Sequence, residues 1–168
     1  MKVEHETLVL LRQRMEDAAA PFAKRESALL EVLHVVQDTL GWIPPDAVEP
    51  VAEFLVMPVS KVSEALSFYT MFRRKAPARY RLQVCRTLTC AICGGADLHG
   101  VIREKLGLAD GETTSDTLFS LEAVECLGAC EMAPAIRVND EPAQGPMDAA
   151  SLAALLERLR REGTAGGI

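Results

Sequence analysis

The sequence has no apolar stretch long enough to cross a membrane. Its longest apolar runs are interrupted by Gln37, Glu53 or Pro58. The N-terminus places acidic residues ahead of a short apolar stretch and has no small-residue cleavage site, which argues against a secretory signal. We therefore expect a cytoplasmic chain that does not insert directly into a membrane.

Basic runs are also missing. The 168 residues include 18 Lys and Arg against 24 Asp and Glu, a net charge of −6. Such a chain offers no line of cations to neutralise a row of phosphates, so we expect no nucleic acid among its partners.

Motifs for independent catalysis are absent as well. The sequence has no G-x-G-x-x-G dinucleotide fingerprint and no evident flavin site. Residues 1–75 contain no nucleophile–base constellation and no phosphate-binding glycine loop. We expect no catalytic residue in this chain.

Residues 1–75 also lack cysteine and any convincing strand, and their apolar residues recur at helical spacing. The clearest stripe is Leu29, Leu33, Val36 and Leu40, followed by Gly41 in the position of a helix C-cap. Further helices are expected to open at a capping box formed by Asp46 and Glu49, and at Ser60. The segment is predicted to be a helical bundle.

Aromatic residues are few, yet Phe68, Tyr69 and Phe72 lie close together beside Arg73. Core packing would explain this cluster. A partner-binding surface would explain it equally well, because interfaces are rich in aromatic residues and arginine. We interpret residues 1–75 as a bundle that docks a partner.

The second half changes to strand-like periodicity after Lys75. Tyr80, Leu82 and Val84 alternate with polar residues and lead into Cys85. Further strands are expected over 118–124 and 135–138, with helices around 98–106 and 152–159. The whole chain is predicted to be α+β, with a thioredoxin-like α/β domain over 76–162 and a flexible tail over 163–168.

All five cysteines lie in this second half, and in a reducing compartment they are better interpreted as ligands than as disulfides. A zinc ribbon would use C-x2-C pairs, whereas Cys85 and Cys90 are spaced C-x4-C and Cys126 and Cys130 are spaced C-x3-C. A plant-type ferredoxin loop would use Cys85, Cys90 and Cys93 with one later cysteine. A thiol redox module would use the C-x-x-C pair Cys90 and Cys93. The interpretation we favour is a 2Fe-2S cluster on Cys85, Cys90, Cys126 and Cys130, two ligands per iron, with Cys93 free.

Several segments together resemble one known family. They are Cys85-x4-Cys90, Cys90-Ala91-Ile92-Cys93-Gly94, Glu125-Cys126-Leu127-Gly128-Ala129-Cys130-x-x-Ala133-Pro134, Gly41-Trp42-Ile43-Pro44, Ser67-Phe68-Tyr69-x-x-Phe72, Gly111-Glu112-x-Thr114 and Val138-Asn139-Asp140-Glu141. Between about Leu29 and Glu141 the chain is similar to the thioredoxin-like 2Fe-2S subunit of bacterial NADH:quinone oxidoreductase (complex I, NuoE family). Related subunits occur in NAD-linked hydrogenases and formate dehydrogenases. The family often has another residue at the position of Cys93, and residues 142–146 depart from its pattern.

The resemblance implies an electron-transfer subunit that exchanges single electrons with FMN on a partner that also binds NADH. Larger iron–sulfur subunits would be further partners, and the chain would be peripheral to the inner membrane through its complex. From the residues, Gly128 allows amide groups to approach the cluster sulfurs, which would raise the reduction potential. Glu125 and Glu131 flank the ligands and would lower it.

Overall fold

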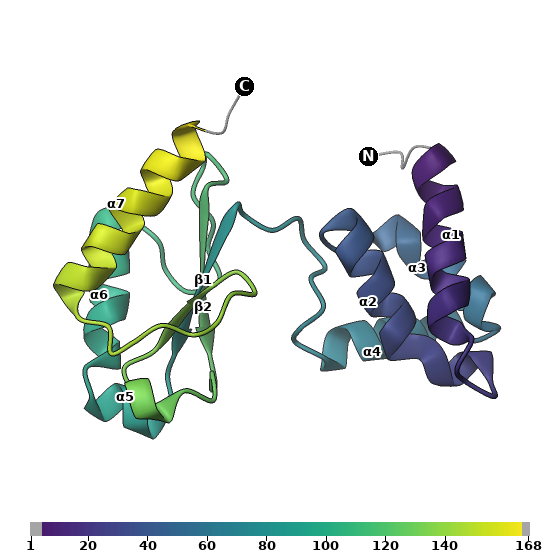
Figure 1. Cartoon of the computed structure of the whole chain (residues 1–168), viewed down its shortest axis with the longest axis horizontal. Helices are drawn as coiled ribbons and strands as arrows, with labels where there is room; N and C mark the ends of the chain where they lie inside the picture. Colours follow the sequence, from purple (N-terminus) through teal and green to yellow (C-terminus); the bar gives the residue numbers. More distant parts are fainter. Residues whose placement is uncertain (1–4, 166–168) are drawn as a thin grey trace. The chain divides into compact units, whose positions relative to one another are not determined.

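The computed structural model describes residues 5–165, and the chain divides between Ala76 and Pro77 into two compact units. The first unit consists of helices (Figure 1). Its elements are α1 (His5–Ala19), η1 (Arg25–Ala28), α2 (Leu29–Leu40), α3 (Pro45–Leu55) and α4 (Val59–Phe68). Within the described chain, none of the helices combines the length and the apolar character that a membrane crossing requires.

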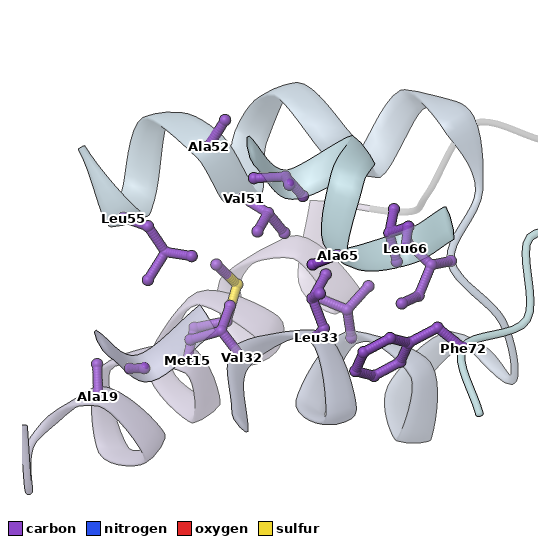
Figure 2. Packing of buried hydrophobic residues seen from close by; sticks show 14 of the residues in the cluster. Met15, Ala19, Val32, Leu33, Val51, Ala52, Leu55, Ala65, Leu66 and Phe72 are labelled. Carbon is purple, nitrogen blue, oxygen red and sulfur yellow. The ribbon is translucent and has the colours of Figure 1, made fainter. Parts of the chain in front are cut away.

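The helical unit packs around one apolar core. Figure 2 shows side chains from its helices pointing toward one another, among them Met15, Leu33, Val51 and Leu66. Phe72 joins this core and is only 5% exposed. The aromatic residues at the end of α4 therefore have different surroundings. Phe68 is 78% exposed, whereas Phe72 is part of the core.

A buried glutamine anchors the segment that follows α4. The side chain of Gln37 donates a hydrogen bond to the carbonyl oxygen of Met71 (3.0 Å) and accepts one from the backbone N–H of Arg73 (2.7 Å). The backbone N–H of Ile43 donates to the carbonyl oxygen of Arg73 (2.7 Å). These bonds satisfy a buried amide and fix the chain as it leaves the bundle.

Two helices of this unit begin differently from the sequence prediction. Helix α3 starts at Pro45 and helix α4 at Val59, and neither has a side-chain cap. The residues before them, Pro44 and Pro58, are extended, so proline sets the entry into both helices. The C-cap prediction is confirmed, since Gly41 has a φ of +80° and its N–H bonds to the carbonyl of Gln37.

The second unit is a small sheet with helices. Its elements are β1 (Tyr80–Cys85), α5 (Leu88–Ile92), α6 (Gly95–Leu106), β2 (Phe119–Val124), η2 (Cys130–Met132), β3 (Ile136–Val138) and α7 (Ala149–Ala165). The strand order is β2-β1-β3, with β2 parallel and β3 antiparallel to β1. Figure 1 shows α6 and α7 together on one face of the sheet, where their apolar residues bury Leu82 and Val84.

The other face of the sheet is polar yet partly closed. The alternation in β1 predicts a half-buried strand, but Arg81 and Gln83 are also buried. Gln83 donates to Glu122 on β2 (2.8 Å) and accepts from Arg137 on β3 (2.7 Å). Arg81 forms an ion pair with Asp140 (2.7 Å). Side chains from neighbouring segments thus cover this polar row and hydrogen-bond to it.

The C-terminal helix is longer than the sequence predicts. Helix α7 continues to Ala165, which places residues 163–165 of the predicted tail in a helix. The Arg79 guanidinium donates to the carbonyl of Gly163 (3.1 Å), and the Thr164 hydroxyl donates to the carbonyls of Arg160 (3.0 Å) and Arg161 (3.0 Å). These contacts extend the last turn despite the glycine. Residues 166–168 of the predicted tail lie outside the described residues.

Candidate iron–sulfur site

The strand register brings two cysteine loops to one edge of the sheet. Strands β1 and β2 are parallel, and Cys85 at the end of β1 pairs with Val124 at the end of β2. The carboxyl ends of parallel neighbours lie side by side, so the chain after Cys85 and the chain after Val124 begin next to each other. In Figure 1, α5 and the short helical turn η2 lie at the same end of this unit.

The first loop supplies two buried thiols. Cys85 and Cys90 are 3% and 1% exposed, whereas Cys93 is exposed at the C-cap of α5. The backbone N–H of Cys85 donates to the carbonyl of Ala135 (3.3 Å), which ties the loop to the chain entering β3. Cys93 therefore differs from the two other thiols of its loop, because it is open to solvent.

The second loop is built on a tight turn. Gly128 has a φ of +67°, a conformation that favours glycine, and its N–H donates to the sulfur of Cys126 (3.3 Å). Cys126 and Cys130 are exposed, and Cys130 begins η2. A backbone amide thus contacts the sulfur of Cys126, one of the predicted ligands.

Both loops contribute to one small apolar cluster that is separate from the two main cores. Its buried members are Cys85, Cys90, Ala129 and Ala135, and Leu127, Met132, Ala133 and Ala143 pack partly against it. Two of the predicted ligands thus lie in the same cluster as residues directly beside the other two. Among residues 5–165, no three His, Cys, Asp or Glu side chains gather closely enough to hold one metal ion.

The two buried thiols have opposite pKa shifts. Burial raises the pKa of Cys85, but hydrogen bonds with Thr87, Cys90 and Leu127 outweigh it, and the pKa lies below its ordinary value. Burial raises the pKa of Cys90 above its ordinary value, and the neighbouring thiols of Cys85 and Cys130 add to that shift. The thiolate is the form that binds metal, and the hydrogen bonds at Cys85 favour that form.

An ion pair joins the two loops on the outside. Arg86, which follows Cys85, donates to the carboxylate of Glu125, which precedes Cys126. This hydrogen bond from Arg86 lowers the pKa of Glu125. The charge of Glu125, which the sequence suggested would lower a cluster potential, is therefore balanced by Arg86 within the site itself.

Two glycines support the loops at positions that the sequence analysis did not single out. A Cβ atom on Gly95 would lie 2.8 Å from the carbonyl oxygen of Cys90. A Cβ atom on Gly145 would lie 2.0 Å from the carbonyl oxygen of Met132, just after Cys130. Both glycines allow the backbone near a predicted ligand to pack at close range.

The donor set fits an iron–sulfur cluster. The four predicted ligands are soft sulfur donors from two adjacent loops, two from each, and 2Fe-2S clusters are held by four thiolates. N–H or O–H groups already contact the sulfurs of Cys85 and Cys126, as is usual around cluster ligands.

This fold and these thiol loops define a thioredoxin-like iron–sulfur protein. The family model described as thioredoxin-like 2Fe-2S ferredoxin matches residues 15–160, and the chain belongs to this family. The family's cofactor is a 2Fe-2S cluster, which confirms the cofactor prediction. The family match and the similar solved structure reported below confirm the predicted fold class.

Similar proteins are subunits of NADH-quinone oxidoreductases, and a similar solved structure is that of an NAD+-reducing hydrogenase. The chain is 41% identical to the E 2 subunit of the NADH-quinone oxidoreductase of Rhizobium meliloti, with 89% of each chain covered. It is 41% identical to subunit 2 of the NADH-quinone oxidoreductase of Thermus thermophilus, over 85% of this chain and 79% of the relative. A crystal structure of an NAD+-reducing NiFe-hydrogenase is similar over 80% of this chain, with a TM-score of 0.70 and 25% identity. The chain spans only 23% of that hydrogenase chain.

Proposed function

We propose that this chain is the electron-transfer subunit of an NADH-oxidising complex and holds one 2Fe-2S cluster on Cys85, Cys90, Cys126 and Cys130. The cluster accepts and returns one electron at a time. The single observation that carries the ligand assignment is the small apolar cluster in which both cysteine loops meet. The exposed position of Cys93 supports leaving it out of the ligand set.

The proposed partners are a subunit that binds FMN and NADH and larger iron–sulfur subunits. The names of the relatives support an NADH-quinone oxidoreductase. Structural similarity to the NAD+-reducing hydrogenase supports a second candidate, the equivalent electron-transfer position in a hydrogenase. Both candidates give this chain the same task, because each complex exchanges electron pairs with a nicotinamide and needs one-electron carriers.

The thiol redox alternative finds little support in the geometry. A reactive C-x-x-C cysteine is partly exposed and has a lowered pKa. Cys90 is instead buried within α5, and burial raises its pKa.

We expect the purified, cluster-loaded chain to contain two irons and two labile sulfides and to show no turnover of NADH with an artificial acceptor. The reason is that the sequence has no dinucleotide fingerprint. Adding the flavin subunit should allow NADH to reduce the cluster, measured by bleaching of its visible absorption. Sustained NADH oxidation by the chain alone would contradict the subunit proposal, as would a colourless, iron-free protein after reconstitution.

The helical unit is proposed to dock the partner through the exposed end of α4. Phe68 is 78% exposed and its ring meets Tyr69 edge to face, with centroids 5.0 Å apart. We expect Phe68→Ser to weaken association with the flavin subunit about tenfold or more, since exposed aromatics are common hot spots. Cluster content should not change, because all proposed ligands lie in the other unit. Calorimetry of binding and iron analysis would measure the two effects separately.

Val59→Ser is the matched control, since Val59 is a 47% exposed apolar residue at the other end of the same helix. It should leave association unchanged. Equal weakening by both variants would contradict a specific docking role for Phe68. Phe72 is unsuitable for this test, because it belongs to the core and its replacement would destabilise the bundle.

A further inference from the structure

Thr87 occupies an unusual position between two of the proposed ligands. It is the N-cap residue of α5, with extended backbone angles (φ −69°, ψ 163°), and its carbonyl accepts the first helical hydrogen bond from Ala91 (2.9 Å). A threonine at an N-cap ordinarily uses its hydroxyl to bind a free N–H of the first turn. Here the hydroxyl makes no capping bond.

The Thr87 hydroxyl instead contacts a sulfur. Its Oγ1 lies 3.1 Å from the Sγ of Cys85, and either atom could be the donor. The backbone carbonyl oxygen of Glu125 also contacts this sulfur, at 3.7 Å. A carbonyl can only accept a hydrogen bond, whereas a hydroxyl can accept or donate.

This difference matters once Cys85 binds iron. A ligating cysteine is a thiolate without a proton, so the Glu125 carbonyl has no donor left to receive from Cys85. The Thr87 hydroxyl can rotate its hydrogen toward the sulfur and become a donor. Hydrogen bonds to cluster sulfurs are among the factors that set the potential of an iron–sulfur cluster, because they favour the more negatively charged, reduced form.

We propose that Thr87 is a positioning residue that donates a hydrogen bond to the Cys85 sulfur and raises the reduction potential of the cluster. The proposal rests on the proposed role of Cys85 as a ligand. In this proposal, the reduction potential of the cluster depends partly on a side chain that binds no metal. Thr87 lies in the same loop as Arg86, which balances the charge of Glu125, so both act in the direction of easier reduction.

The test is a redox titration of the full, cluster-loaded chain, followed by absorption and by the paramagnetic signal of the reduced cluster. Thr87→Val keeps the size of the side chain and removes the hydroxyl. We expect it to shift the ratio of reduced to oxidised cluster at a fixed potential about tenfold toward the oxidised form, equivalent to about 59 mV for one electron. Thr87→Ser restores the hydroxyl and should restore the potential.

Thr89→Val is the matched control. It makes the same substitution in the same loop, next to Cys90, at an exposed threonine whose hydroxyl has no hydrogen bond among the described residues. Its potential should equal that of the unmodified chain. A Thr87→Val protein with unchanged potential would overturn the proposal, and so would equal shifts in Thr87→Val and Thr89→Val.

If Thr87→Val binds no cluster, Thr87→Ala decides the question, because the smaller side chain cannot crowd the loop. A lowered potential in Thr87→Ala supports the role, and an unchanged potential overturns it. The titration needs no partner subunit, so its result is independent of the complex that the chain joins. Failure of the ligand assignment is recognised separately, because Cys85→Ser would then retain the cluster.

Discussion

Chains that carry Cys126→Ser or Cys130→Ser are expected to lose the cluster almost completely, whereas Cys93→Ser keeps it. Iron in a 2Fe-2S cluster is held by thiolates, and the serine oxygen is a harder and poorer ligand for it. Cys93 is exposed at the C-cap of α5, so its replacement should change the free energy of unfolding by no more than about 0.5 kcal/mol. Visible absorption, iron analysis and the paramagnetic signal of the reduced protein measure the outcome.

The position of Cys93 also dictates a control. Cys93 is a free, exposed thiol beside the site and would be available to replace a lost ligand, so each ligand variant should be repeated in a Cys93→Ser background. A plant-type loop predicts the opposite pattern, with the cluster lost in Cys93→Ser and retained after the loss of Cys126 or Cys130. Cys93→Ser protein that is folded but free of iron would show that our ligand assignment is wrong.

Gly145→Ala is expected to have a comparably large effect without touching a cysteine. The added Cβ would lie 2.0 Å from the carbonyl oxygen of Met132 and 2.9 Å from that of Pro134. Side chains essentially never approach backbone so closely, so the chain must move. It has little freedom to do so, because Gln144 exchanges two hydrogen bonds with Ile136 (2.7 and 3.0 Å) and the N–H of Met147 bonds to the carbonyl of Pro134 (2.9 Å).

We expect this overpacking to destabilise the second unit by about 3 kcal/mol and to reduce its iron content, since Met132 lies in the same short helical turn as Cys130. Chemical denaturation and iron analysis measure both effects. Gly100→Ala is the control: Gly100 is inside α6, a Cβ there meets nothing within 4 Å, and we expect a gain of about 0.5–1 kcal/mol. Gly145→Ala protein with an unchanged unfolding midpoint would contradict the close packing described here.

The sequence predicts those parts of the site that depend on local spacing. The alternation of apolar and polar residues predicted β1 and placed Cys85 at its end. This prediction is possible because the side chains of a strand alternate with a period of two whatever its neighbours are. The position of Gly41 predicted a helix end, and its φ is positive. Two cysteine loops that each follow a strand were predicted to meet, and the parallel register of β1 and β2 brings them together.

Other features depend on residues distant in the sequence. Arg81 and Gln83 are buried because Glu122, Arg137 and Asp140 come from neighbouring segments to bind them, and no local pattern encodes those partners. Thr87 has the residue type and the position of an ordinary N-cap, so only the three-dimensional structure reveals its contact with sulfur. The Gly-Pro pair at 145–146 indicates a turn in the sequence. It does not indicate that Gly145 packs against the carbonyl of Met132.

The connection between β1 and β2 implies that the proposed cluster also stabilises the second unit. Ligands at both ends of that connection would make the cluster an inorganic cross-link, closing a loop of roughly 36 residues between Cys90 and Cys126. By the chain-entropy argument for cross-links, such a closure restricts the unfolded chain by about 4 kcal/mol. The helical unit lies outside the closed loop. The four bonds between cysteine and iron that hold the cluster would therefore also stabilise the second unit. The helical unit would depend on its own apolar core.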